Sequence, residues 1–119
     1  MIQEFSLKNF LSFDGKQTID LLASKDKTHL DELTFEPKEG VKILKLLMIY
    51  GANASGKSNL LIAIQSLWMM MISPEQKEND KIDFYRPFKL NNGKPIEFDI
   101  VFWMNDRKFR YEIKFNEFE

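Results

Sequence analysis

Hydrophobic and polar positions alternate along four stretches of the chain, and this period of two predicts β-strands. In residues 2–13, Phe5 and Leu7 fall on one face and polar side chains fall on the other. Residues 16–23 resume the alternation after Asp14-Gly15, a dipeptide that is typical of tight turns. The amino-terminal part is therefore predicted to form an antiparallel hairpin.

The strongest alternation lies near the carboxyl end and predicts a second antiparallel hairpin. Asn105-Asp106 joins its two arms and predicts the turn. Because most of the 11 Phe residues occupy alternating positions, we interpret them as core residues rather than as a surface that stacks on nucleic-acid bases. The alternating apolar residues of the two arms are Ile96, Phe98, Ile100, Phe102, Met104, Phe109, Tyr111, Ile113 and Phe115.

Two neighbouring segments are apolar without alternation. Residues 46–50 form a short continuous run, which predicts a central strand buried on both faces. Residues 59–72 have the composition of a helix that is apolar around most of its circumference. A surface helix shows a wider polar face, so we expect this one to be covered by a sheet and by a further element. Its narrow stripe of small or polar residues comprises Asn59, Ala63, Ser66 and Ser73.

A polar and charged segment, residues 24–40, separates the first hairpin from the apolar run. It contains breakers such as Pro37, which predicts a loop or short irregular structure. Leu33 and Phe35 are expected to anchor it. The single histidine, His29, lies here and is interpreted as a solvated loop residue rather than a catalytic one.

The composition is that of a soluble globular protein, since 44% of the 119 residues are hydrophobic and 29% are charged. The length predicts one domain over residues 1–119. A formal net charge of −1 provides no general basic field for nucleic acid, and the absence of Cys excludes disulfides and thiolate metal sites. No apolar run approaches the ~20 residues of a membrane span and no leader is recognised, so a cytoplasmic location without membrane contact is expected.

One motif carries recognisable chemistry. Between the apolar run and the helix lies a complete GxxxxGK[ST] phosphate-binding loop, or Walker A motif: Gly51, Ala52, Asn53, Ala54, Ser55, Gly56, Lys57 and Ser58. Its glycines let the backbone wrap around phosphate oxygens, while successive N–H groups and the positive end of the following helix attract anions. Lys57 adds a charge for the β- and γ-phosphates, and the Ser58 hydroxyl is suited to Mg²⁺. The motif predicts that the chain binds a nucleoside triphosphate.

Two features of the sequence admit more than one interpretation. Asn53 tolerates strained loop dihedrals, and its side chain is also suited to touch a phosphate or a nucleophilic water. The last hairpin carries four basic residues with Asp99, Asp106, Glu112, Glu117 and Glu119 interleaved among or after them, which favours a solvated strand face over a DNA-contacting edge. The basic residues are Arg107, Lys108, Arg110 and Lys114.

Three segments together resemble a known family. They are residues 7–13 (Leu-Lys-Asn-Phe-Leu-Ser-Phe), residues 49–61 around the loop, and residues 86–90 (Arg-Pro-Phe-Lys-Leu). The chain is similar to the amino-terminal part of a prokaryotic ABC-type AAA ATPase of the ATP/GTP-binding protein kind. Such proteins are related to the recombination, SMC and overcoming-lysogenisation-defect (OLD) ATPases. The resemblance spans essentially the whole chain, and Asn59 directly after Ser58 is typical of that group.

The resemblance implies an α/β P-loop NTPase fold, as a partial ABC-ATPase-like head lobe with a mixed sheet, antiparallel hairpins and one main helix after the Walker A loop. ATP and Mg²⁺ are the implied cofactors, held by residues 51–59 with Ser58 on the metal. In the whole protein it implies a head-to-head homodimer, in which the signature loop of one subunit closes over the Walker loop of the other. The implied setting is DNA maintenance or phage defence.

The sequence also departs from the family pattern. A Walker B run (four apolar residues followed by Asp-Glu), the signature loop and the late switch His are not found, and Leu11 stands where many relatives carry a basic residue that reaches the nucleotide. The chain is therefore expected to be the first lobe of a larger head domain, binding ATP without efficient hydrolysis, and no catalytic residue is assigned. Two alternatives stay open. One is a small P-loop phosphotransferase, and the other is a non-catalytic interaction module.

Overall fold

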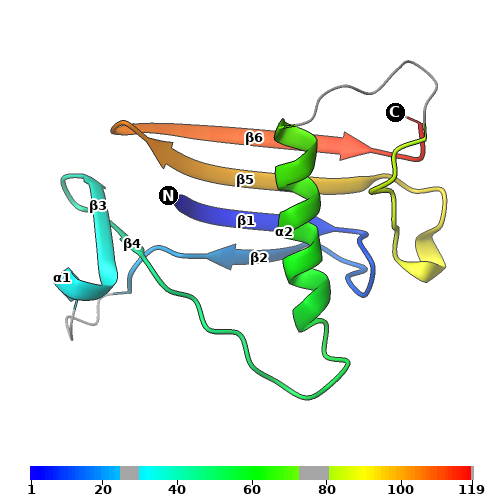
Figure 1. Ribbon diagram of the computed structural model, residues 1–119, viewed down its shortest axis with the longest axis horizontal. Coiled ribbons are helices and arrows are strands. Elements are labelled where there is room, and N and C mark those ends of the chain that lie inside the picture. The colour runs from blue at the N-terminus through cyan, green and yellow to red at the C-terminus, as the bar shows by residue number, and fades with distance from the viewer. Residues whose placement is uncertain (25–29, 73–80, 119) are drawn as a thin grey trace.

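The fold is built on one antiparallel sheet crossed by a single long helix (Figure 1). The computed structural model describes residues 1–24, 30–72 and 81–118, so that His29 and Ser73 lie outside the described residues. The sheet has the order β2-β1-β5-β6, and each neighbouring pair is antiparallel. Its strands are β1 (Ile2–Lys8), β2 (Gln17–Asp20), β5 (Ile96–Met104) and β6 (Arg107–Phe115).

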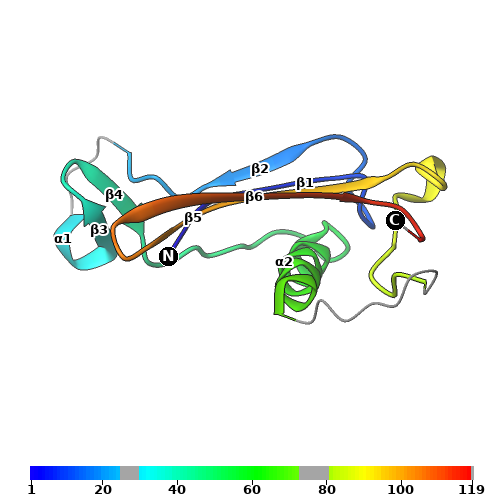
Figure 2. The same cartoon turned by 90° about the horizontal axis from the view of Figure 1, so that it is seen from above.

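The remaining elements lie around this sheet. The long helix α2 (Lys57–Ile72) covers one face, as the view from above shows (Figure 2). A short helix α1 (Leu30–Leu33) leads into a separate two-stranded sheet made of β3 (Thr34–Lys38) and β4 (Val41–Leu44). A 3₁₀ turn η1 (Lys89–Asn91) precedes β5. Among the described residues, no helix is long and apolar enough to cross a membrane.

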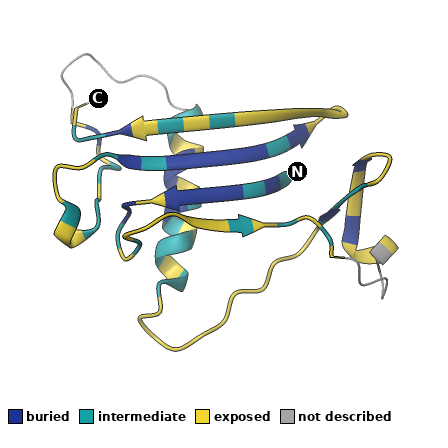
Figure 3. Ribbon diagram, turned by 180° about the vertical axis from the view of Figure 1, so that it is seen from behind, coloured by how far each residue is buried: buried dark blue, intermediate teal, exposed yellow. Residues whose placement is uncertain are grey.

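The core lies between the sheet and α2, and the two central strands are its most buried part (Figure 3). Phe5 and Leu7 share one face of the sheet and the Phe residues are part of the core, as the sequence predicted, and this face is the α2 side, where Phe98 also lies. The Phe98 ring lies at the centre of an aromatic cluster. Its ring centroid is 6.1 Å from Phe5, 5.2 Å from Phe10 and 5.7 Å from Phe115.

The turn of the β5–β6 hairpin confirms the prediction made from Asn105-Asp106. Met104 pairs with Arg107, which leaves a two-residue loop. Both loop residues have positive φ, 49° for Asn105 and 59° for Asp106. This is the backbone of a type I′ turn, whose twist matches that of the flanking strands.

The turn gives a direct test of this geometry. Asp106→Gly is expected to raise the free energy of unfolding by roughly 0.5–1 kcal/mol, because glycine adopts positive φ without the steric cost that an L side chain incurs. Urea denaturation of both proteins measures the difference. Lys108→Gly within β6 is the matched control and should destabilise the chain, since glycine weakens a strand interior. A loss of stability in Asp106→Gly would contradict the turn assignment.

The predicted central strand at residues 46–50 was wrong for the described structure. The segment is not assigned to a strand, and Figure 1 shows it passing outside the β2 edge of the sheet. Its side chains are exposed, with 62% of Leu46, 73% of Met48 and 88% of Tyr50 accessible to solvent. Two-sided burial needs strand neighbours and two covering layers, and none of the strand pairings among the described residues includes residues 46–50.

The prediction of irregular structure for residues 24–40 was also wrong in part, because it missed α1 and β3. Pro37 obscured the strand in the sequence, and it lies where the β3–β4 register shifts between Phe35 and Lys38. Proline is tolerated at such bulges because no ladder N–H is needed there. The expected anchors Leu33 and Phe35 are exposed, whereas Ile43 of β4 is fully buried.

Helix α2 begins at Lys57 and is oriented by its small residues. Ala63 and Ser66 of the small stripe are buried together with Leu67, in the core that contains the phenylalanines of the sheet. The opposite side of the helix carries large exposed residues, among them Leu61 and Trp68. The sequence predicted cover on several sides, and the described residues provide it on the sheet side.

Candidate nucleotide-binding loop

The phosphate-loop motif forms a compact turn, and its last two residues, Lys57 and Ser58, are the first two of α2. The first hydrogen bond of the helix runs from the Leu60 N–H to the Gly56 carbonyl, at 3.0 Å. The N–H groups of residues 57–59 precede that bond and have no acceptor within the helix. They lie at the positive end of a 16-residue helix, which makes this end of α2 suited to an anion.

Gly56 is required by both its conformation and its surroundings. Its φ is +92°, a value that an L side chain rarely adopts. A Cβ at this position would lie 3.1 Å from the Ser12 hydroxyl and 3.5 Å from the Phe13 ring. Glycine therefore allows the loop to pass directly against the turn that follows β1.

Gly51 does not have a positive φ, but its position is crowded, since an added Cβ would lie 3.1 Å from the Ser55 hydroxyl. The prediction of strained loop dihedrals at Asn53 needs a correction. The strained position is Ala54, with φ of 61°, and not Asn53. Asn53 therefore does not serve the loop through tolerance of strain, and its side chain remains available for the polar role.

The Lys57 side chain folds over the loop and ties its start to its end. The ammonium donates to the carbonyl oxygens of Gly51 and Ala52 at 2.8 and 2.6 Å. A longer contact of 3.4 Å reaches the Ser55 hydroxyl. These bonds hold the positive charge of Lys57 against the first residues of the loop.

The loop surrounds a cavity of about 310 Å³. All its lining residues belong to the predicted site, namely Asn53, Ala54, Ser55, Gly56, Lys57, Ser58 and Asn59. No carboxylate is among these lining residues, so the cavity is formed by amides, hydroxyls and one ammonium group. Gly51 and Ala52 contribute through the carbonyls that hold Lys57.

Sequence reasoning missed the contribution of the turn at residues 9–14. Residues 2–13 were predicted as one strand, but β1 ends at Lys8 because Asn9 has φ of 56° and Leu11 has φ of 48°. The turn brings Ser12 to the phosphate loop, where its hydroxyl accepts a 2.9 Å hydrogen bond from the side-chain amide of Asn59. The signal in the sequence is Asn9, since asparagine is enriched at positive φ.

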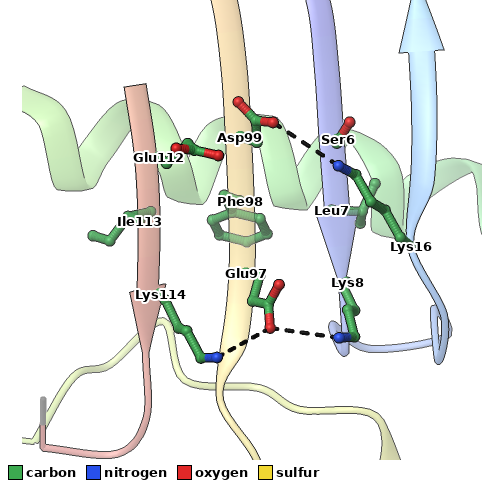
Figure 4. A pocket seen from close by; sticks show the side chains of 10 residues that line it. All are labelled: Ser6, Leu7, Lys8, Lys16, Glu97, Phe98, Asp99, Glu112, Ile113 and Lys114. Atoms are coloured by element: carbon green, nitrogen blue, oxygen red, sulfur yellow. Dashed lines mark hydrogen bonds and ion pairs between the residues drawn. The ribbon is translucent and has the colours of Figure 1, made fainter. Parts of the chain in front are cut away.

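A second concavity lies on the sheet face away from α2, and ion pairs dominate it (Figure 4). Glu97 pairs with Lys8 at 3.5 Å and with Lys114 at 3.4 Å. Asp99 accepts two hydrogen bonds from Arg110, at 3.0 and 2.7 Å. The hydrogen bonds that Arg110 donates to Asp99 raise the pKa of Arg110 above its ordinary value. Because Arg110 and Lys114 are matched by carboxylates, this face favours the solvated-strand interpretation over a DNA-contacting edge.

Comparison with known families decides the broader assignment. Residues 46–119, more than half of the chain, match the family described as "AAA domain, putative AbiEii toxin, Type IV TA system". The chain belongs to this family. A search of curated proteins gives no match. The AAA-domain match includes the phosphate loop, α2 and the β5–β6 hairpin. The strands β1–β4 and the turn that carries Ser12 lie outside it. Membership in this AAA-domain family supports nucleotide binding by a P-loop ATPase, a class that usually uses Mg²⁺.

Proposed function

We propose that the chain binds ATP together with Mg²⁺ at residues 51–59. The observation that carries the proposal is one cavity lined by residues 53–59, which include Lys57 and the first residues of α2. The N–H groups of those first residues have no acceptor within the helix. Gly56 supports the same conclusion through its backbone, because its φ of +92° gives the loop a shape that an L side chain rarely allows.

The residues present fit a triphosphate and its metal ion. The N–H groups of the loop and of the α2 terminus would donate to phosphate oxygens. Lys57 would donate to the β- and γ-phosphates, and the exposed Ser58 hydroxyl in the first turn of α2 would serve as a Mg²⁺ ligand. The metal, when bound, supplies charge neutralisation at the phosphates. Asn53 lines the cavity and would contact a phosphate or a water near it.

The described chain is suited to hold ATP more than to cleave it. Hydrolysis needs a group that orients or polarises the attacking water, and the residues lining the cavity provide no carboxylate for this task. We propose that the loop belongs to an ABC-type ATPase whose site is completed in a head-to-head homodimer. The exposed apolar residues 46–50 and the outer side of α2 support a further protein surface against this lobe.

The cellular setting is proposed from likeness alone. The motifs resemble ATPases that act in DNA maintenance or phage defence, and the matched family is described by a toxin of a type IV toxin–antitoxin system. DNA is the alternative partner, although the paired charges of the outer sheet face give it little support. A cytoplasmic location is also proposed from this likeness to the family.

Nucleotide titration of the full chain tests the proposal. We expect saturable binding of ATP that tightens with Mg²⁺, together with phosphate release at the background rate, because the cavity holds phosphate donors but no water-activating acid. Calorimetry measures the first and a phosphate-release assay the second. The absence of binding to any nucleoside triphosphate with Mg²⁺ would refute nucleotide binding. Phosphate release well above background would instead favour the phosphotransferase or a self-sufficient ATPase.

A further inference from the structure

The phosphate loop is braced by Ser12, a residue to which the sequence analysis assigned no role. Ser12 lies 47 positions before Asn59 in the chain, yet its hydroxyl accepts a 2.9 Å hydrogen bond from the side-chain amide of Asn59. The same hydroxyl lies 3.1 Å from where a Cβ of Gly56 would be. Ser12 therefore contacts the loop at the residue with positive φ and bonds to the first turn of the helix that follows.

The turn that carries Ser12 is itself fixed to the sheet and to the segment before β5. Phe10 and Phe13 exchange two backbone hydrogen bonds at 2.9 and 2.8 Å. The Leu11 N–H donates to the Arg86 carbonyl at 2.9 Å. The buried Asn9 amide donates to the carbonyls of Lys94 and Pro95 at 3.0 and 3.1 Å. A turn held at so many points is rigid enough to act as a support.

We propose that the Ser12–Asn59 hydrogen bond holds the phosphate loop in its nucleotide-binding shape, which makes Ser12 a positioning residue for the site. The inference rests on the proposed nucleotide binding. A loop that is ordered before the ligand arrives loses less conformational entropy on binding. Because the hydrogen bond joins the side chains of Ser12 and Asn59 and does not involve Lys57, the brace acts on the position of the loop and of the first turn of α2 rather than on the phosphates.

A double-mutant cycle tests the brace in the full chain. Ser12→Ala and Asn59→Ala are each expected to raise the Kd for MgATP by roughly 3- to 10-fold, the effect of one neutral hydrogen bond. The double variant should bind no more weakly than the single variants, since all three lack the same bond. Ser12→Thr keeps the hydroxyl and should retain the wild-type affinity.

The matched control is Ser6→Ala in β1. It removes the 2.8 Å hydroxyl bond between Ser6 and Thr18, which lies away from the loop. This change should lower the free energy of unfolding in urea without changing the Kd for MgATP. A merely structural role for Ser12 would give the same pattern, with lower stability at unchanged affinity.

The outcomes separate the two proposals. If the wild type binds MgATP and both single variants bind equally well, the brace is refuted and the nucleotide site stands. Additive losses in the double variant would also refute the brace, because they would show that Ser12 and Asn59 act independently. If the wild type binds no nucleotide, the proposed function fails and the brace fails with it.

Discussion

Replacing Lys57 by alanine is expected to weaken MgATP binding by about 100-fold, because charge-assisted hydrogen bonds are worth roughly 1.5–3 kcal/mol each. The ammonium lies over the loop and is held by the carbonyls of Gly51 and Ala52. The substitution removes the one side-chain cation among the residues that line the cavity. Calorimetric titration of both proteins with MgATP measures the change.

Lys45→Ala is the matched control for this substitution. The Lys45 ammonium is exposed and also donates to a backbone carbonyl, that of Glu32, at 3.1 Å. Its removal deletes the same charge and a similar bond away from the phosphate loop, so the Kd for MgATP should not change. Equal losses in the two variants would mean that affinity depends on the net charge of the chain. Unchanged binding in Lys57→Ala would exclude the phosphate loop as the binding site.

The parts of the fold that were predicted correctly depend on local information. The β5–β6 hairpin was found because its alternation and its two-residue turn lie within 20 consecutive positions, from Ile96 to Phe115. Helix α2 was found for the same reason, with its start at Lys57 rather than Asn59. The residues that line the cavity, 53–59, are also contiguous, so their gathering around it follows from the chain path alone.

The failures share a different cause, which is dependence on distant partners. Residues 46–50 have the apolar composition of a buried strand. Burial depends on which elements pack against a segment, and the composition of residues 46–50 does not indicate those elements. The Ser12–Asn59 bond joins positions far apart in the chain, and no pattern within residues 2–13 points to residue 59. Local sequence thus revealed the phosphate donors of the site, while the support behind them required the tertiary structure.

Phe98→Ala is expected to lower the free energy of unfolding by about 3–5 kcal/mol, the usual cost of removing a buried phenylalanine. Only 1% of the Phe98 side chain is exposed, and three other rings surround it within 6.1 Å. Domains are stable by roughly 5–15 kcal/mol, so this one substitution takes a large share of the total. Urea denaturation monitored by Trp fluorescence measures the loss.

Phe109→Ala provides the comparison, because Phe109 is partly exposed and stacks on one ring, that of Phe102 at 5.6 Å. Its loss should cost about 1 kcal/mol, in the range measured for aromatic pairs. If Phe98→Ala is too unstable to purify, Phe98→Leu keeps most of the apolar volume and should still cost more stability than Phe109→Ala.

The Phe98 cluster also includes Phe10, which lies in the turn that carries Ser12. A Phe98 variant that remains folded should therefore bind MgATP more weakly as well, whereas equal stability losses at positions 98 and 109 would contradict the central role of this ring.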